Sequence, residues 1–388
     1  MDFRLPLSIP AALLALVIIG CEPANDIPQV TPPEAQTEFD ADTQPDAEAT
    51  TQLWQQGEQA IATTLKNSQT LLEAINTFIK APGPSTQLQA QNQWIQTELS
   101  YQQLYFFSQF GVTEPKVFAQ LARAHFDAAA HPIQPGYLDY VGPYPYSGLV
   151  HDISVDITST NLREQHGMTD AEDVVLGLYA IEFMLFGETG QRPPDDYTPV
   201  AKLSLEQRQT GFKTIQETPN NRRRALLSLQ AQLLSNDLKN LAQHWQSREP
   251  NAMHSLWQTL PASAQRMVAL KTFERTLTQL LLQTAVAPPK HEPSDSDAGE
   301  NAPSEPHKKN TLQASRLALS IQSLSAAYPW LPEQQRALIE AQLLQAQTFA
   351  QQLTPSANPA ETPDQPSTPL WKNCYQALKA AMDIYLQG

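Results

Sequence analysis

Two residues with the chemistry of metal ligands, Tyr179 and Glu182, stand three positions apart in the apolar stretch 174–186. Residues three apart in a helix lie on one face, so the phenol and the carboxylate could contact the same metal ion. Because a phenol has a reference pKa of about 10, the pair suits a hard, strongly Lewis-acidic ion such as Fe(III) better than zinc. The alternative is that Tyr179 packs in the core and its hydroxyl bonds Glu182, which would satisfy both groups.

The helix that must carry this pair is expected over residues 170–187. Thr169 and Glu172 form the S/T-x-x-E pattern that caps helix N-termini, and Gly187 follows the last apolar residue, where helices commonly close. Apart from Gly177 and Glu182, positions 174–186 are apolar on all sides, which is typical of the central helix of a core. It is too short to cross a bilayer.

A buried Glu182 carboxylate would need a partner, a metal or a proton. We expect the partner to come from Arg222 or Arg223, which begin the helix predicted over 220–246. A solvated helix end is the alternative interpretation of these arginines.

His151 and Asp152, close to Asp156 and His166, are the other side chains of metal-binding type near the motif. We take His151 and Asp152 as further candidate ligands. The alternative is a set of solvated polar residues around a short helix.

The segment Gly177–Gly187 resembles the signature helix of the imelysin-like proteins, in which Gly-x-His-x-x-Glu is followed by an apolar run and Gly. Gly177, Glu182 and the Leu-Phe-Gly ending match, but Tyr179 stands at the histidine position. Residues 222–245 resemble another helix of the family.

Trp94 and Tyr101 resemble an aromatic pair of the same family. Glu98 lies between them, where the family tends to place a basic residue. The family often carries further polar residues after a flexible insertion, and residues 310–315 show no clear equivalent.

The resemblance implies an all-α fold of two antiparallel up-and-down four-helix bundles packed together. Members are associated with iron uptake or its regulation at the bacterial envelope, and some are regarded as metal-dependent peptidases. Because Tyr179 replaces the motif histidine, we expect a non-catalytic binding or accessory component. The alternatives are a metal-dependent peptidase and a structural interaction scaffold. The cofactor would be iron or another divalent or trivalent metal ion, or none.

The N-terminus has the features of a lipoprotein signal. Residues 1–20 combine Arg4 with an apolar core, and the following Ile18-Ile19-Gly20-Cys21 resembles a bacterial lipobox. We therefore expect lipid on Cys21 and a periplasm-facing protein bound to a membrane. Because Glu22 rather than Asp follows the cysteine, we expect this to be the outer membrane. An ordinary signal peptide with a coincidental cysteine is the alternative. The partners would be the membrane and an envelope protein.

The rest of the sequence predicts the domain organisation. Residues 21–50 are rich in proline and acidic residues and contain neither Lys nor Arg. They should form a disordered tether. A first bundle is expected over 51–205 and a second over 206–388, with flexible insertions at 285–310 and 354–369. The net charge of −15 argues against nucleic acid as a partner.

Overall fold

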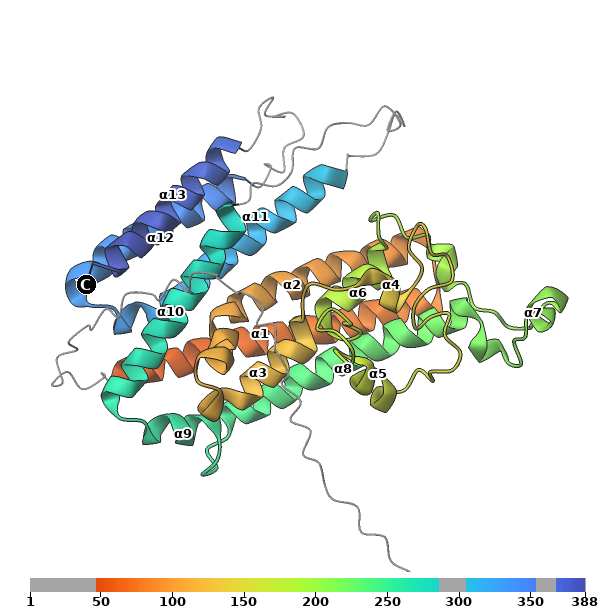
Figure 1. Ribbon diagram of the computed structural model, residues 1–388, viewed down its shortest axis with the longest axis horizontal. Helices are drawn as coiled ribbons and strands as arrows, with labels where there is room; N and C mark the ends of the chain where they lie inside the picture. Colours follow the sequence, from red (N-terminus) through yellow and green to blue (C-terminus); the bar gives the residue numbers. More distant parts are fainter. Residues whose placement is uncertain (1–46, 286–304, 354–367, 388) are drawn as a thin grey trace, which may run out of the picture. The chain divides into compact units, whose positions relative to one another are not determined.

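The computed structural model describes residues 47–285, 305–353 and 368–387, which form helices joined by turns and loops (Figure 1). These residues contain no β-strand, only one isolated bridge between Val141 and Tyr144. The predicted all-α fold class is therefore confirmed. The predicted signal at 1–20 and Cys21 lie outside the described residues. Among the residues that the structure describes, no helix is both long and apolar enough to span a membrane.

The helix predicted over 220–246 is present, and other helices extend into segments that were predicted to be flexible. Helix α1 begins at Ala47 rather than after residue 50, so the last part of the predicted tether is helical, as are residues 305–310 and 368–369 of the predicted insertions. The long helices are α1 (Ala47–Lys80), α2 (Pro84–Thr113), α3 (Pro115–Ala129), α8 (Pro219–Gln246), α10 (Ala262–Ala285), α11 (Glu305–Ser323), α12 (Glu333–Gln352) and α13 (Thr368–Tyr385). The short ones are α4 (Pro135–Leu138), α5 (Ser159–Gln165), α6 (Gly177–Phe186), α7 (Leu205–Gln209) and α9 (Met253–Thr259), with 3-10 turns at Pro194–Tyr197, Ile215–Glu217 and Leu324–Trp330.

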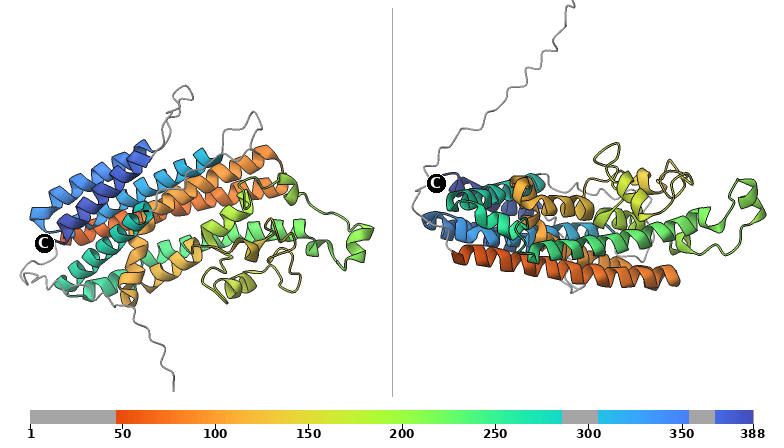
Figure 2. Two further views of the ribbon diagram at one scale, coloured as in Figure 1. Left: turned by 45° about the horizontal axis from the view of Figure 1, so that its top comes forward. Right: turned by 90° about the horizontal axis from the view of Figure 1, so that it is seen from below.

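Prolines mark where several helices begin. Pro84, Pro115 and Pro219 are the first residues of α2, α3 and α8, where the missing backbone N–H costs nothing. Since the connection between α1 and α2 is short, the two helices pack side by side, and α1 also packs against α8 (Figure 2).

Two tryptophans hold α1 and α8 together. The Trp54 and Trp245 rings stack with centroids 4.7 Å apart, and Trp245 Nε1 donates a hydrogen bond to the Trp54 carbonyl at 3.0 Å. Gly57 makes this approach possible, because a Cβ there would lie 2.2 Å from the Trp245 ring.

Helix α8 packs mainly on α1, α3 and α6, whereas α10 to α13 pack on one another and reach α2 through α10 and α11. A boundary at residues 205/206 therefore does not follow the helix contacts. The described residues all belong to one compact unit, Phe39–Gly388. The division into two four-helix bundles stays a prediction.

The motif helix differs from its predicted bounds, because α6 begins at Gly177 rather than residue 170. The Asp173 carboxylate accepts hydrogen bonds from the backbone N–H groups of Thr169 and Asp170, at 3.1 and 2.9 Å. These contacts close the S/T-x-x-E segment into a turn. The buried residues between the turn and Gly177 form a non-helical approach to α6.

His166 holds this approach in place. Its Nδ1 accepts hydrogen bonds from the backbone N–H groups of Val175 and Leu176, at 3.2 and 3.4 Å. The proton is therefore on Nε2, which donates to the Phe126 carbonyl at 3.0 Å. Burial lowers the His166 pKa, which keeps this neutral form. Both ring nitrogens of His166 form hydrogen bonds with backbone groups, so neither is available for a ligand.

Gly177 fixes the point at which α6 begins. Its φ of +84° lies in the left-handed region, and a Cβ would meet the Ala128 backbone carbonyl at 2.6 Å. Backbone atoms cannot move aside as a flexible side chain would, so this position requires glycine.

We predict that Gly177→Ala destabilises the protein by more than about 2 kcal/mol, because left-handed backbone alone costs about 1–2 kcal/mol outside glycine and the clash adds to it. Thermal unfolding should show a melting temperature several degrees lower. Gly83→Ala is the matched control: nothing lies within 4 Å of its Cβ position, and a cap change of this kind costs less than about 1 kcal/mol. Equal melting temperatures for the two variants would contradict this account of the α6 start.

Candidate functional site

Helix α6 brings Tyr179 and Glu182 together with Glu98 of α2 and Arg316 of α11, and we name these four residues the Arg316 cluster. Glu98 is fully buried, and Arg316 Nε lies 2.7 Å from its Oε1. Arg316 Nη2 lies 3.9 Å from Glu182 Oε2. One guanidinium therefore lies against two carboxylates that come from different helices.

Aromatic rings surround the guanidinium. Its central carbon lies 5.7 Å from the ring centres of both Trp94 and Tyr179, within the range of cation–π attraction. Trp94 is attached to α6 through a hydrogen bond from Nε1 to the Leu178 carbonyl, at 2.8 Å. The His131 ring packs against Tyr179 with centroids 4.7 Å apart. These rings limit where the positive charge can move.

Polar side chains extend the contact between α2 and α11. Gln102 Nε2 donates to Glu98 Oε1 at 2.6 Å, and Ser320 Oγ donates to Gln102 Oε1 at 2.9 Å. The second carboxylate oxygen of Glu98 is buried without a hydrogen-bond partner. An uncompensated charge at such a place is costly, so Glu98 depends on Arg316.

The environment shifts several pKa values in the cluster. Burial raises the pKa of Glu98, and the Arg316 charge opposes that shift. Burial and the charge of Glu98 raise the pKa of Tyr179 well above its ordinary value, so the phenol is protonated at neutral pH. Burial and the Arg316 charge lower the pKa of His131, which favours a neutral imidazole.

The structure corrects two expectations about Glu182. Its side chain is 36% exposed and not enclosed, because α6 packs on α2, α3, α4 and α8 while Glu182 extends towards α11. The cation beside it is Arg316, not Arg222 or Arg223. Arg222 donates hydrogen bonds to the backbone carbonyls of the loop that precedes α5, those of Leu149, Val150, Asp152 and Val155.

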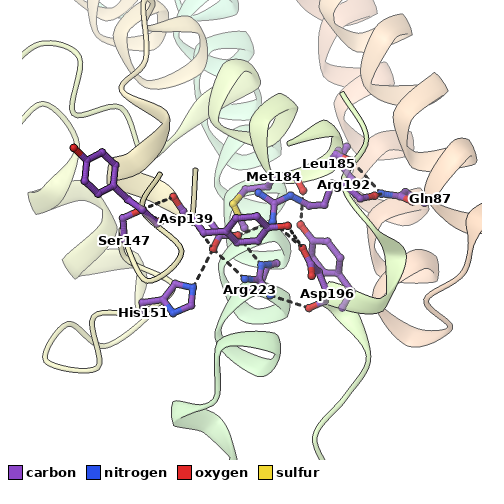
Figure 3. Close-up of polar contacts among 12 residues, drawn as sticks. Gln87, Asp139, Ser147, His151, Met184, Leu185, Arg192, Asp196 and Arg223 are labelled. Carbon is purple, nitrogen blue, oxygen red and sulfur yellow. Dashed lines mark hydrogen bonds and ion pairs between the residues drawn. The ribbon is translucent and has the colours of Figure 1, made fainter. Parts of the chain in front are cut away.

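Arg223 belongs to a second buried group, the Asp139 cluster of Asp139, Arg192, Asp196 and Arg223 (Figure 3). Asp139 is fully buried and accepts hydrogen bonds from Arg223 Nε at 2.6 Å and Arg192 Nη1 at 2.7 Å. Asp196 Oδ2 lies 3.1 Å from Arg192 Nη1. Burial alone would raise the Asp139 pKa, but hydrogen bonds with His151 and Arg223 and the arginine charges hold it well below its usual range. The cluster thus links the loop that contains Asp139 and the segment that contains Arg192 and Asp196 to α8.

The further candidate ligands His151 and Asp152 have contacts elsewhere. His151 Nε2 lies 3.5 Å from Asp139 Oδ1, and Asp152 Oδ1 accepts hydrogen bonds from the Ser154 backbone and hydroxyl at 2.9 and 2.6 Å. These contacts place the two residues with the Asp139 cluster and its loop. In the described part of the chain, no three or more His, Cys, Asp or Glu side chains are grouped so that they could hold a metal ion.

The donors at Tyr179 and Glu182, as arranged, do not suit a metal ion. The phenol resists deprotonation, and the carboxylate already has a guanidinium beside it. A metal cation there would be repelled by a fixed positive charge.

Arg316 and Asp139 are the residues that sequence reasoning missed. Arg316 directly follows the stretch 310–315, in which no polar equivalent was found. It is also the only charged residue between Leu312 and Trp330, and this isolation in an otherwise uncharged helical stretch could have identified it. Asp139 had no such signal, because it lies in a loop among tyrosines and prolines.

We predict that Glu98→Ala destabilises the protein far more than Glu182→Ala. Removing Glu98 takes away the closer and fully buried carboxylate partner of the Arg316 guanidinium, and breaking a buried pair costs about 3–5 kcal/mol. Glu182 is partly exposed and its guanidinium contact is long, so its loss should cost about 0–1 kcal/mol. Chemical denaturation of both variants checks this, and a larger loss for Glu182→Ala would reverse our ranking of the two carboxylates.

Comparison with known proteins shows which family the chain belongs to. A family model described as Imelysin matches residues 44–383, which include the motif helix and all four residues of the Arg316 cluster. No curated protein matches the chain. Since the family model covers most of the sequence, the chain belongs to the imelysin family.

Proposed function

We propose that the protein is a lipid-anchored component of the bacterial envelope that acts without catalysis, as a binding or accessory protein in the uptake of iron or another metal or in its regulation. The link to iron comes from the association of imelysin-like proteins with iron uptake. The observation that carries the non-catalytic role is the combination of two features at the motif. Tyr179 stands at the histidine position, and the Arg316 guanidinium lies against the motif carboxylate.

With these two features the motif lacks what metal-assisted hydrolysis needs. A catalytic metal site uses several ligands and keeps one position open for water. The motif here supplies a protonated phenol and a carboxylate that is already paired with a cation. The His131 imidazole packs against Tyr179, and burial together with the charge of Arg316 lowers its pKa.

An interaction scaffold is a second candidate, supported by one surface feature. Tyr144 and Tyr146 are 65% and 83% exposed on the proline-rich loop between α4 and α5. The Asp139 cluster fastens this loop to α8, so the tyrosines are displayed from a supported position. An envelope protein partner would fit either role.

We predict that the purified protein does not cleave casein in the presence of Zn²⁺, Mn²⁺ or Fe²⁺. The reason is the missing imidazole ligand and the guanidinium at the motif. Product peptides are measured over time, with thermolysin as positive control and Glu182→Gln as the matched variant. Chelator-sensitive cleavage that Glu182→Gln abolishes would show that the protein is a peptidase.

We also predict that Cys21→Ser abolishes membrane attachment. Cys21 follows the lipobox-like Ile18-Ile19-Gly20, and its thiol would carry the lipid. Detergent phase partitioning of the wild type and the variant, expressed in a Gram-negative host, measures this. Because Cys374 is the other cysteine of the chain, Cys374→Ser is the control and should partition as the wild type. A Cys21→Ser protein that still enters the detergent phase would rule out the anchor.

A further inference from the structure

We propose that the guanidinium of Arg316 is the resident cation of the motif site and that it excludes metal ions from Tyr179 and Glu182. Arg316 would thus be the residue that determines cation specificity at this site. The inference refines the proposed function and rests on its assignment of the motif as a binding region without catalysis.

The first argument is the charge around the guanidinium. Two carboxylates, Glu98 and Glu182, lie 2.7 and 3.9 Å from its nitrogens. These are the anionic groups that a metal ion at the motif would use. Since the guanidinium already lies against both, an incoming cation would find its ligands neutralised and a positive charge a few ångströms away.

The second argument is that Arg316 cannot easily leave. Glu98 is fully buried and one of its oxygens has no hydrogen-bond partner, so the loss of the guanidinium would leave an uncompensated charge. The rings of Trp94 and Tyr179 add attraction to the same cation. A metal would therefore have to displace a positive charge that the fold itself requires.

The third argument concerns what the site would offer without Arg316. Without the guanidinium, the carboxylates of Glu98 and Glu182 would no longer have this positive charge beside them. Carboxylate ligands suit Mn²⁺ and related divalent ions. Removal of the guanidinium should thus turn an excluded site into an accepting one.

The test is a titration of the lipid-free mature protein with Mn²⁺, followed by the electron paramagnetic resonance signal of the free ion. We expect the wild type to leave the signal unchanged at protein concentrations of the order of 100 µM. Arg316→Ala should bind one Mn²⁺ at least about tenfold more tightly than the wild type, and the added change Glu182→Gln should remove that binding. Arg316→Lys, which keeps the charge, should behave as the wild type.

Arg336→Ala is the matched control, because Arg336 is also a partly buried helical arginine but donates to the backbone carbonyls of Pro329 and Leu331. It should bind no Mn²⁺. A general loosening of the fold would instead produce binding in both alanine variants, which would contradict the specific role of Arg316.

Two results would overturn the inference. One is wild-type binding of a single Mn²⁺ that Glu182→Gln abolishes. The other is an Arg316→Ala protein with the circular dichroism of the wild type but no gain in Mn²⁺ affinity. If that variant does not fold, the wild type and Glu182→Gln still decide the matter. Metal binding without cleavage would refute the exclusion alone, whereas cleavage of casein would refute the proposed function.

Discussion

A carboxylate that is removed from water must be matched by positive charge, and this requirement determines how separate parts of the protein are joined. Glu98 on α2 and Asp139 in the loop after α4 are both fully buried. Each is matched by arginine from a distant part of the chain: Arg316 of α11 for Glu98, and Arg223 of α8 with Arg192 for Asp139. Apolar packing tolerates many helix arrangements, whereas each of these charge pairs requires its two segments to lie together.

The motif helix is held in place by contacts with its backbone. Gly177 allows α6 to approach α3 closely, His166 holds the segment before it, and Trp94 donates to a carbonyl within it. Tyr179 and Glu182 are therefore presented to Arg316 from a fixed element. Since the helix has only ten residues, its position depends on these contacts rather than on its own stability.

The long helices could be predicted because their signals are local. The helix predicted over 220–246, for example, agrees with α8 to within one residue. The start of α6 could not be predicted in this way. The Thr169 amide, which the capping pattern assigns to the Glu172 side chain, donates to Asp173, and the Glu172 amide, which it assigns to the Thr169 side chain, donates to Asp170. Here one local hydrogen-bond arrangement replaced another of similar strength.

The site was only half predictable for a related reason. The motif identified Tyr179 and Glu182, and the aromatic pair drew attention to Glu98. The partner of a charge is a property of the tertiary fold, however, and Arg316 is separated from Glu98 by most of the chain. The nearest run of arginines in the sequence was Arg222 to Arg224, yet Arg222 and Arg223 are used by loop carbonyls and by Asp139.

The central claim is that a guanidinium, and not a metal, provides the positive charge at the motif. It can be tested most directly by a crystal structure of the protein grown with excess Mn²⁺, with data collected to detect the anomalous signal of manganese. Our account predicts no anomalous peak at Tyr179 and Glu182, with Arg316 still lying against Glu98. An anomalous peak coordinated by Glu182, with Arg316 displaced from Glu98, would contradict it.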